Sequence, residues 1–151
     1  MKLAEALLIR AQMQQKLQGL QACILANLRV QEGEPVQEDP AVLLQEAMET
    51  SRALAKIIQQ INACNVATKL PDGRTLSEAL ADRDALTRQY SLLAAIANAA
   101  MDRNLRMTRT ELVTHLTLPI ADIQKQMDTL AQQRRELDVQ IQSANWTTDM
   151  D

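Results

Sequence analysis

Apolar residues recur at steps of three and four along four stretches of the chain, and this spacing predicts four amphipathic helices. The stretches cover residues 3–30, 40–67, 75–100 and 119–145. Because the connections between them are short, neighbouring helices should run antiparallel and pack at a small crossing angle. The sequence therefore predicts an all-α fold, an antiparallel bundle of four long helices with coiled-coil-like seams.

Residues with special backbone roles mark the helix starts. Asp39 supplies a capping acceptor in front of Pro40, and proline is well suited to the first position of a helix. Pro71-Asp72-Gly73 predicts a tight turn, which could close a very short β-hairpin. Thr75 and Glu78 then match a capping box, in which each side chain binds a free backbone N–H of the first helical turn. A further helix should therefore begin at this threonine.

Residues 103–118 lose the helical period. Threonines and leucines interleave there in a partly alternating pattern, which favours an extended segment or a loop. A minor short β-hairpin at the Pro71-Asp72-Gly73 turn, or an extended segment at 103–118, is therefore the departure from an all-helical chain that the sequence predicts.

The length of 151 residues fits one helical-bundle domain spanning residues 1–151. The chain has no Phe, one Tyr and one Trp, so the core must be built from Leu, Ile, Met, Val and Ala. Residues 1–30 hold four basic residues, whereas residues 31–50 hold six acidic residues and no base, so these two segments should lie close together. The net charge of −3 argues against nucleic acid as a partner.

Three features of the sequence indicate the cellular compartment of the protein. No apolar run approaches the roughly 20 residues that span a bilayer, and the first residues lack the pattern of a secretion signal. Cys23 and Cys64 stand far apart without a C-x-x-C motif, so they imply neither a disulfide framework nor a zinc site. We therefore expect a cytoplasmic protein with two reduced thiols.

Each predicted seam contains one polar interruption. Arg10, Arg83 and Arg134 occupy positions that an apolar residue should hold, and the second helix has Thr50-Ser51 instead. One interpretation is that the arginine stems line the seam while the guanidinium groups reach water. The alternative is a polar layer that sets helix register or subunit pairing, or that binds an anion.

A second polar group lies at the junction between the second and third predicted helices. Asn62 and Asn65 are three residues apart, hence on one helical face, and their amides could converge on one ligand. The alternative is helix termination with turn hydrogen bonds. Trp146, which follows Asn145, is expected to be a hydrophobic plug that closes the bundle rather than a stacking platform for a ligand. The members of this polar cluster are Asn62, Asn65, Thr68, Asp72, Arg74 and Thr75.

Motifs for catalysis are not found in the sequence. The chain's single histidine, His115, follows Glu111 by four residues, whereas carboxylate-bridged di-iron bundles use Glu-x-x-His twice. Phosphate-binding, dinucleotide-binding and zinc-protease motifs do not occur. The acidic residues between 32 and 39 do not have the spacing of a calcium loop. We therefore assign no catalytic, cofactor or metal residue and lean against an enzyme.

Several strings of the sequence resemble the septicolysin-like family, a group of uncharacterised bacterial helical proteins. They are Met1-Lys2-Leu3-Ala4-Glu5-Ala6-Leu7, Val30-Gln31-Glu32-Gly33-Glu34, the block from Ile61 to Asp84 and Ala144-Asn145-Trp146-Thr147-Thr148-Asp149. The resemblance implies a helical fold over essentially the whole chain. The family label also implies a pore-forming cytolysin, but no established catalytic residues come with it.

The leading functional hypothesis is a self-assembling homo-oligomer with a structural or partner-binding role. Long helices, alanine-rich contact surfaces and arginine interruptions are all features that can specify association. The second hypothesis is a binder of a small anion or a nucleotide, or an enzyme, that uses the polar cluster. The third is a cytolysin, and it rests on the family resemblance alone.

Overall fold

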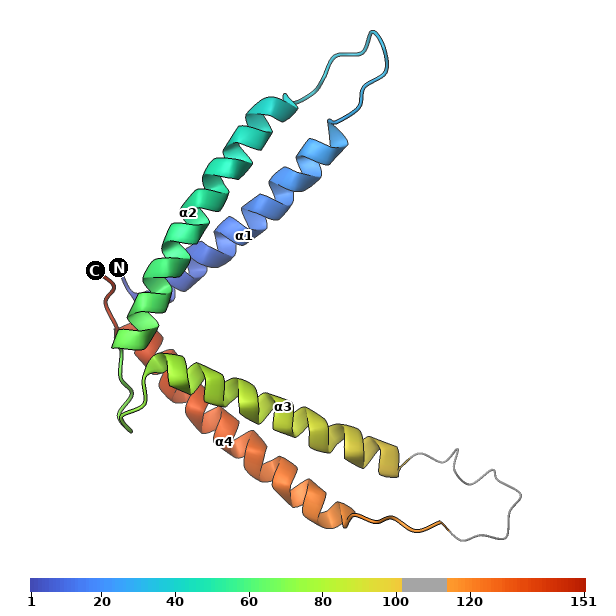
Figure 1. Ribbon diagram of the computed structural model, residues 1–151, viewed down its shortest axis with the longest axis vertical. Coiled ribbons are helices and arrows are strands. Elements are labelled where there is room, and N and C mark those ends of the chain that lie inside the picture. The colour runs from blue at the N-terminus through green and yellow to red at the C-terminus, as the bar shows by residue number, and fades with distance from the viewer. Residues whose placement is uncertain (102–113) are drawn as a thin grey trace. The chain divides into compact units, whose positions relative to one another are not determined.

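The computed structural model describes residues 1–101 and 114–151 (Figure 1). These residues form four α-helices: α1 (Leu3–Ala26), α2 (Pro40–Ala67), α3 (Leu76–Ala100) and α4 (Ile120–Thr147). The predicted all-α fold is confirmed, since helices α1 and α2 pack together, as do α3 and α4, and the described residues contain no sheet.

The chain separates into two compact units, and each is described by itself. The first consists of Met1–Lys69 together with Ser143–Asp151, and the second of Leu70–Gln142. Helix α4 therefore contributes most of its length to the second unit and its last turn to the first. The expectation of one domain over residues 1–151 stays a prediction.

Helices α1 and α2 form an antiparallel hairpin in the first unit (Figure 1). One stripe of each helix faces the other, and the most buried members include Leu3, Leu20, Ile57 and Ile61. The predicted closeness of the basic and acidic segments is borne out by an ion pair of 2.8 Å between Lys16 and Glu46. This pair lies beside the seam, where side chains flanking the contact of two antiparallel helices meet.

The steps of three and four predict a seam on α2 through Leu44, Ala47, Leu54, Ile58 and Ile61. The last four are buried or half-buried, but Leu44 is 53% exposed, while its neighbour Leu43 is half-buried. The buried positions Thr50, Ile57 and Ile61 follow the steps of seven and four that this shifted seam requires. The predicted polar interruption is thus Thr50 alone, since Ser51 is exposed.

Helix α1 ends at Ala26, earlier than the predicted end near Val30. The physical cause is Asn27, whose side-chain amide donates a hydrogen bond of 2.9 Å to the carbonyl oxygen of Cys23. The amide oxygen of Asn27 also accepts from the backbone N–H of Glu38 at 3.4 Å. An asparagine that binds backbone groups in this way offers the chain an alternative to continued helix, so the helix stops.

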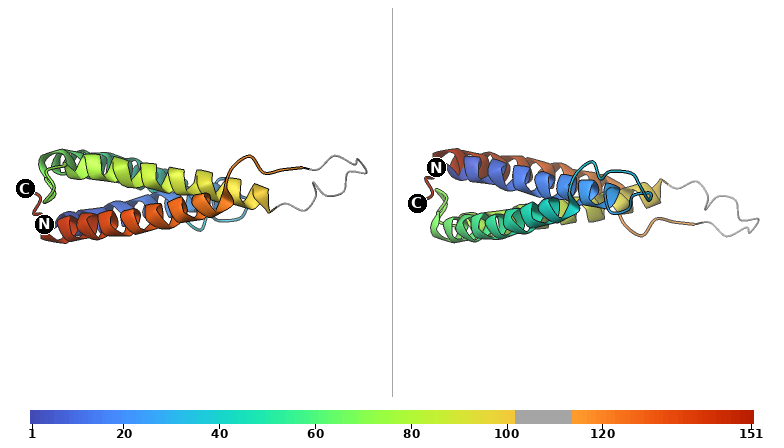
Figure 2. Two further views of the ribbon diagram at one scale, coloured as in Figure 1. Left: turned by 90° about the horizontal axis from the view of Figure 1, so that it is seen from below. Right: turned by 90° about the horizontal axis from the view of Figure 1, so that it is seen from above.

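The two ends of the chain meet within the first unit (Figure 2). The backbone N–H of Leu3 donates to the carbonyl of Thr148 at 3.0 Å, and that of Met150 donates to the carbonyl of Met1 at 2.8 Å. The ammonium group of Lys2 adds an ion pair of 2.8 Å with Asp149. This contact, which is the isolated bridge between Lys2 and Asp149, fixes the start of α1 to the residues that follow α4.

Helices α3 and α4 form the hairpin of the second unit, and they lie side by side (Figure 1). Ala97 packs in a cluster with Ile123 and Met127, against which Tyr90 and Ala94 are partly buried. The alanines on α3 bring few side-chain atoms to the contact, so the larger side chains of α4 fill it. An alanine-rich surface is thus the place where α3 meets its neighbouring helix.

The turn before α3 has the predicted chemistry. The backbone N–H of Leu70 donates to the carbonyl of Arg74 at 2.8 Å, and Gly73 adopts a φ of 91°, which favours glycine. Thr75 and Glu78 form the expected capping box, with hydrogen bonds of 3.1 and 2.8 Å. Asp39 likewise caps α2 by accepting from the N–H of Ala41.

The predicted extended or loop segment at 103–118 is described only in part. Residues 114–118 lie outside any helix and are exposed, whereas 102–113 lie outside the described residues.

The capping box gives a first testable prediction. Thr75→Ala should lower the free energy of unfolding by about 1 kcal/mol, because one N–H of the first turn of α3 loses its acceptor. Urea denaturation followed by circular dichroism measures this loss. The matched control is Ser77→Ala in the same turn, where the exposed side chain caps nothing; an equal loss in both variants would contradict the role of the capping box.

Candidate functional site

Arg74 is the centre of an ionic cluster between the turn and α3. Its Nε and Nη2 atoms donate to the Asp72 carboxylate at 2.9 and 2.6 Å, and its Nη1 atom donates to Asp82 at 2.8 Å. The hydrogen bonds from Arg74 hold the pKa of Asp72 below its ordinary value, and the two carboxylates raise the pKa of Arg74. Because every guanidinium nitrogen already has a carboxylate partner, Arg74 stabilises the turn rather than offering free hydrogen-bond donors to an anionic ligand.

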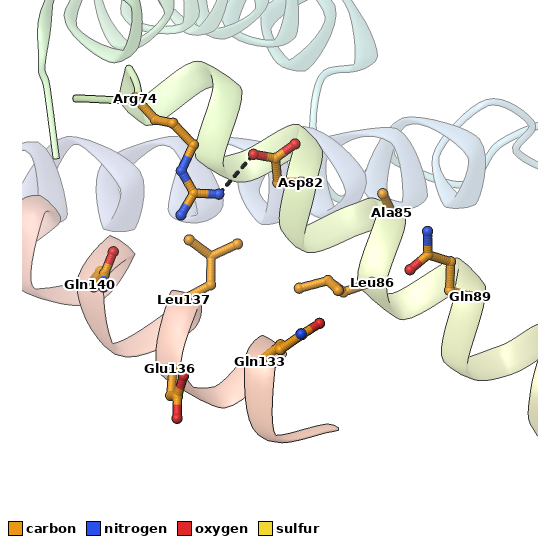
Figure 3. Close-up of a pocket in the computed structure, with 9 residues that line it drawn as sticks. All are labelled: Arg74, Asp82, Ala85, Leu86, Gln89, Gln133, Glu136, Leu137 and Gln140. Carbon is orange, nitrogen blue, oxygen red and sulfur yellow. Dashed lines mark hydrogen bonds and ion pairs between the residues drawn. The ribbon is translucent and has the colours of Figure 1, made fainter. Parts of the chain in front are cut away.

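Arg74 also borders a groove of about 440 Å³ along one side of the α3·α4 hairpin (Figure 3). Leu86 and Leu137 point toward each other between the two helices, and amide side chains such as Gln89, Gln133 and Gln140 flank them. The carboxylates of Asp82 and Glu136 also line this groove and repel an anion, while the guanidinium of Arg74 is already bonded to carboxylates. This side of the second unit is therefore a poor candidate for the predicted anion site.

The other side of the α3·α4 hairpin is rich in arginine around Arg83. Its Nη1 atom donates to the Asp138 carboxylate at 2.7 Å, which joins α3 to α4 in the seam. The predicted interruption of the α3 seam is thus a half-exposed ion pair. A groove of about 610 Å³ surrounds this pair and is also lined by Arg134, Arg135 and Tyr90.

Arg134 is exposed, although it falls at a seam position of α4. The structure brings it to the same groove as Arg83, so two of the three predicted seam arginines lie together. The third, Arg10, is half-buried in α1, and its Nε atom is buried with no hydrogen-bond partner among the described residues. Arg83 and Arg134 thus line one groove of the second unit, whereas Arg10 belongs to the first unit, and a polar layer at Arg10 stays a prediction.

The remaining members of the predicted cluster divide between the two units. In the second unit Asp72, Arg74 and Thr75 serve the turn and the start of α3, as described above. In the first unit Asn62 is exposed and Asn65 is half-buried. The Thr68 hydroxyl lies 3.7 Å from the Cys64 thiol. This agrees with the interpretation that these residues end helix α2.

Trp146 was expected to close the bundle, and this expectation is wrong for the described residues. Its side chain is 60% exposed, whereas its neighbours Ala144 and Asn145 are buried. The reason is helical geometry: successive residues point about 100° apart, so only some positions of the last turn of α4 face inward. The inward positions belong to the small alanine and the asparagine.

A surface that the sequence reading missed lies on one side of the α1·α2 hairpin. The side that holds the Lys16–Glu46 pair also carries Glu5, Glu49 and Lys56, whereas the opposite side of the seam carries no charged residue. We call this second surface the uncharged face. It comprises Ala4, Leu7, Ala11, Gln14, Gln18, Gln21 and Leu25 of α1 with Ala41, Leu44, Met48, Ser51, Ala55, Ile58, Asn62 and Asn65 of α2.

Most of the uncharged face is accessible in the described structure. Leu25 is 61% exposed, Leu44 is 53% exposed and Met48 is 54% exposed. Isolated exposed apolar residues are common, whereas a larger apolar patch that is rimmed by polar residues marks an interaction surface. The absence of charged residues from the positions that flank the α2 seam on this side is the sequence signal that could have revealed the uncharged face.

Metal and nucleophile chemistry find no support in the geometry that is described. Outside residues 102–113, no group of three His, Cys, Asp or Glu residues is arranged to hold a metal ion. His115 is exposed, and Cys23 and Cys64 are both free thiols.

Together these features define an all-α protein made of helical hairpins, with a charged groove on one hairpin and an uncharged face on the other. The chain belongs to DUF6847, a family of unknown function whose model matches residues 10–150. It is also similar to a solved structure described as a functionally unknown conserved protein from Corynebacterium diphtheriae. The two chains are 34% identical with a TM-score of 0.92, and the match covers 100% of this chain and 99% of the other. No curated protein matches.

The family match corrects the resemblance to septicolysin-like proteins. The family that matches most of the chain is DUF6847, and the descriptions of this family and of the solved structure state an unknown function and no cytolysin. The shared strings therefore identified a helical protein of unknown function but attached the wrong family to it. Among the described helices, none is both long and apolar enough to cross a bilayer.

The Arg74 cluster predicts a pH dependence. Because the folded-state pKa of Asp72 is lowered, its ion pair contributes stability above the unfolded value of about 3.9, and this contribution is lost as the pH falls through the folded pKa. In Asp72→Asn the loss of stability on acidification below about pH 5 should be shallower than in the wild type. Thermal unfolding between neutral and acidic pH measures the slope, with the exposed Asp84→Asn as the control. An unchanged slope in the Asp72 variant would contradict the assignment.

Proposed function

We propose that the protein is a self-associating helical protein whose role is assembly or partner binding, and that its uncharged face is the contact surface between two copies. The single observation behind this proposal is the charge asymmetry of the α1·α2 hairpin. One side of the seam carries glutamate and lysine, while the other offers Leu, Met, Ile and Ala with Gln, Asn and Ser. Two such faces can meet without burying a charge.

A second copy is the partner that the chemistry of this face favours. Covering a charged surface with a surface that has no counter-charge costs several kcal/mol per ion. The uncharged face of a second copy imposes no such cost, and a two-fold axis brings identical surfaces together.

The uncharged face is also large enough for a specific interface between two copies. From Ala4 to Leu25 the face extends for about 32 Å at 1.5 Å per residue, and two adjacent helices are about 20 Å wide. The projected area is about 640 Å² on each copy, or about 1,300 Å² for the pair. Specific interfaces bury about 1,200–2,000 Å² in total, so the face lies at the lower end of that range.

The proposal includes a reducing compartment such as the cytoplasm. Cys23 and Cys64 are free, and unpaired thiols are usual where glutathione and thioredoxin maintain reduction.

The test is Met48→Glu, which introduces a charge at the middle of the uncharged face. If two copies meet there, burying two carboxylates should raise the dimer dissociation constant at least 100-fold, equivalent to about 2.7 kcal/mol. Sedimentation velocity over micromolar concentrations measures the change. The matched control is Val42→Glu on the charged side of the same helix, where a residue of 61% exposure becomes acidic and should leave association unchanged.

Three outcomes would contradict the proposal. One is a wild-type protein that sediments as a monomer at every concentration. Another is an equal loss of association in both variants, which would indicate a general charge effect. The third is a monomeric wild type that Met48→Glu destabilises strongly, since that result would mean that the face is covered within the same chain.

A further inference from the structure

The groove around Arg83 has a charge pattern that the self-association proposal does not use. It opens on one side of the α3·α4 hairpin and has a volume of about 610 Å³, within the range of about 300–1,000 Å³ that is usual for small-molecule sites. Its lining residues are Arg83, Asp84, Thr87, Tyr90, Ala131, Arg134, Arg135 and Asp138. Three guanidinium groups thus face two carboxylates, which leaves an excess of one positive charge.

The guanidinium groups are not equally engaged. Arg83 donates one hydrogen bond to Asp138, and the structure shows no other partner for its guanidinium in residues 1–101 and 114–151. Arg134 and Arg135 form no ion pair with any described residue. This differs from Arg74, whose nitrogens are all bonded to carboxylates. The groove therefore offers planar N–H donors that a ligand can still reach.

The position of Arg134 argues for a role beyond solvation. Ile120, Met127 and Ile141 precede and follow it at heptad steps along the α4 seam, where they are buried or half-buried. An apolar residue in place of Arg134 would extend the contact between α3 and α4 by one layer. The arginine instead leaves this layer open to solvent, and Tyr90 fixes one wall because its ring packs against the neighbouring cluster.

From this arrangement we propose that the groove binds a small molecule that carries a phosphate or diphosphate group, with Arg134 and Arg135 as the principal contacts. Guanidinium groups bind phosphate oxygens through paired N–H donors, and such bonds are about twice as strong as those between neutral groups. The Arg83–Asp138 pair holds the third guanidinium in place. The Asp84 carboxylate disfavours a ligand that extends toward it, so we expect a compact anion.

The experiment is isothermal titration of the full chain with inorganic pyrophosphate at low salt. The expected result is saturable binding with a dissociation constant below about 1 mM, and at least a tenfold weaker affinity in the double variant Arg134→Gln, Arg135→Gln. The matched control is Arg88→Gln, because Arg88 is an exposed arginine of α3 that does not line the groove. It should bind pyrophosphate as the wild type does.

Two results would overturn the inference. One is the absence of saturable binding by the wild type, and the other is an equal loss in the Arg88 variant, which would indicate attraction by general charge. Circular dichroism of both variants checks that the helices remain intact. The self-association proposal is unaffected by either result, since it rests on the other hairpin.

Discussion

The contact between two antiparallel helices along a heptad seam is the constraint from which the rest of this structure follows. A seam buries one stripe of each helix and leaves the flanking positions to be filled by whatever lies beside the pair. In the α1·α2 hairpin the buried stripe contains Leu20, Ile57 and Ile61, and the two flanks differ completely in charge. Because helices bury apolar surface only against another layer, the composition of a flank indicates what should cover it.

The four helices and their starts were predictable because short-range signals decide them. Asp39 with Pro40 and Thr75 with Glu78 act within one turn, and the structure shows both caps. The end of α1 was missed because the competing hydrogen bonds of Asn27 reach Glu38, eleven residues away. The shift of the α2 seam from Leu44 to Leu43 was missed because both stripes of that helix are apolar, and only the partner helix selects between them.

The candidate site was predictable in its residue types but not in its arrangement. The sequence singled out Arg83 and Arg134 at seam positions and Arg74 in the turn before α3, yet the structure gives each a different environment. Each guanidinium nitrogen of Arg74 donates to Asp72 or Asp82, Arg83 pairs with Asp138 across the hairpin, and Arg134 is exposed and lines the same groove as Arg83. Those partners lie 2, 8 and 55 residues away along the chain, and only the nearest pair is visible to a local pattern. Trp146 shows the same limit, because a periodic pattern does not fix which residues of the last turn face inward.

If a second copy covers the uncharged face, the side chain of Met48 loses access to solvent when two copies associate. Hydroxyl-radical footprinting of the wild-type protein over a wide concentration range measures the oxidation rate of Met48 against that of Met101, whose side chain is 76% exposed on the other hairpin. Oxidation of Met48 is expected to slow as the concentration rises, while oxidation of Met101 does not change. A Met48 oxidation rate that is independent of concentration would contradict the covering of this face by a second copy.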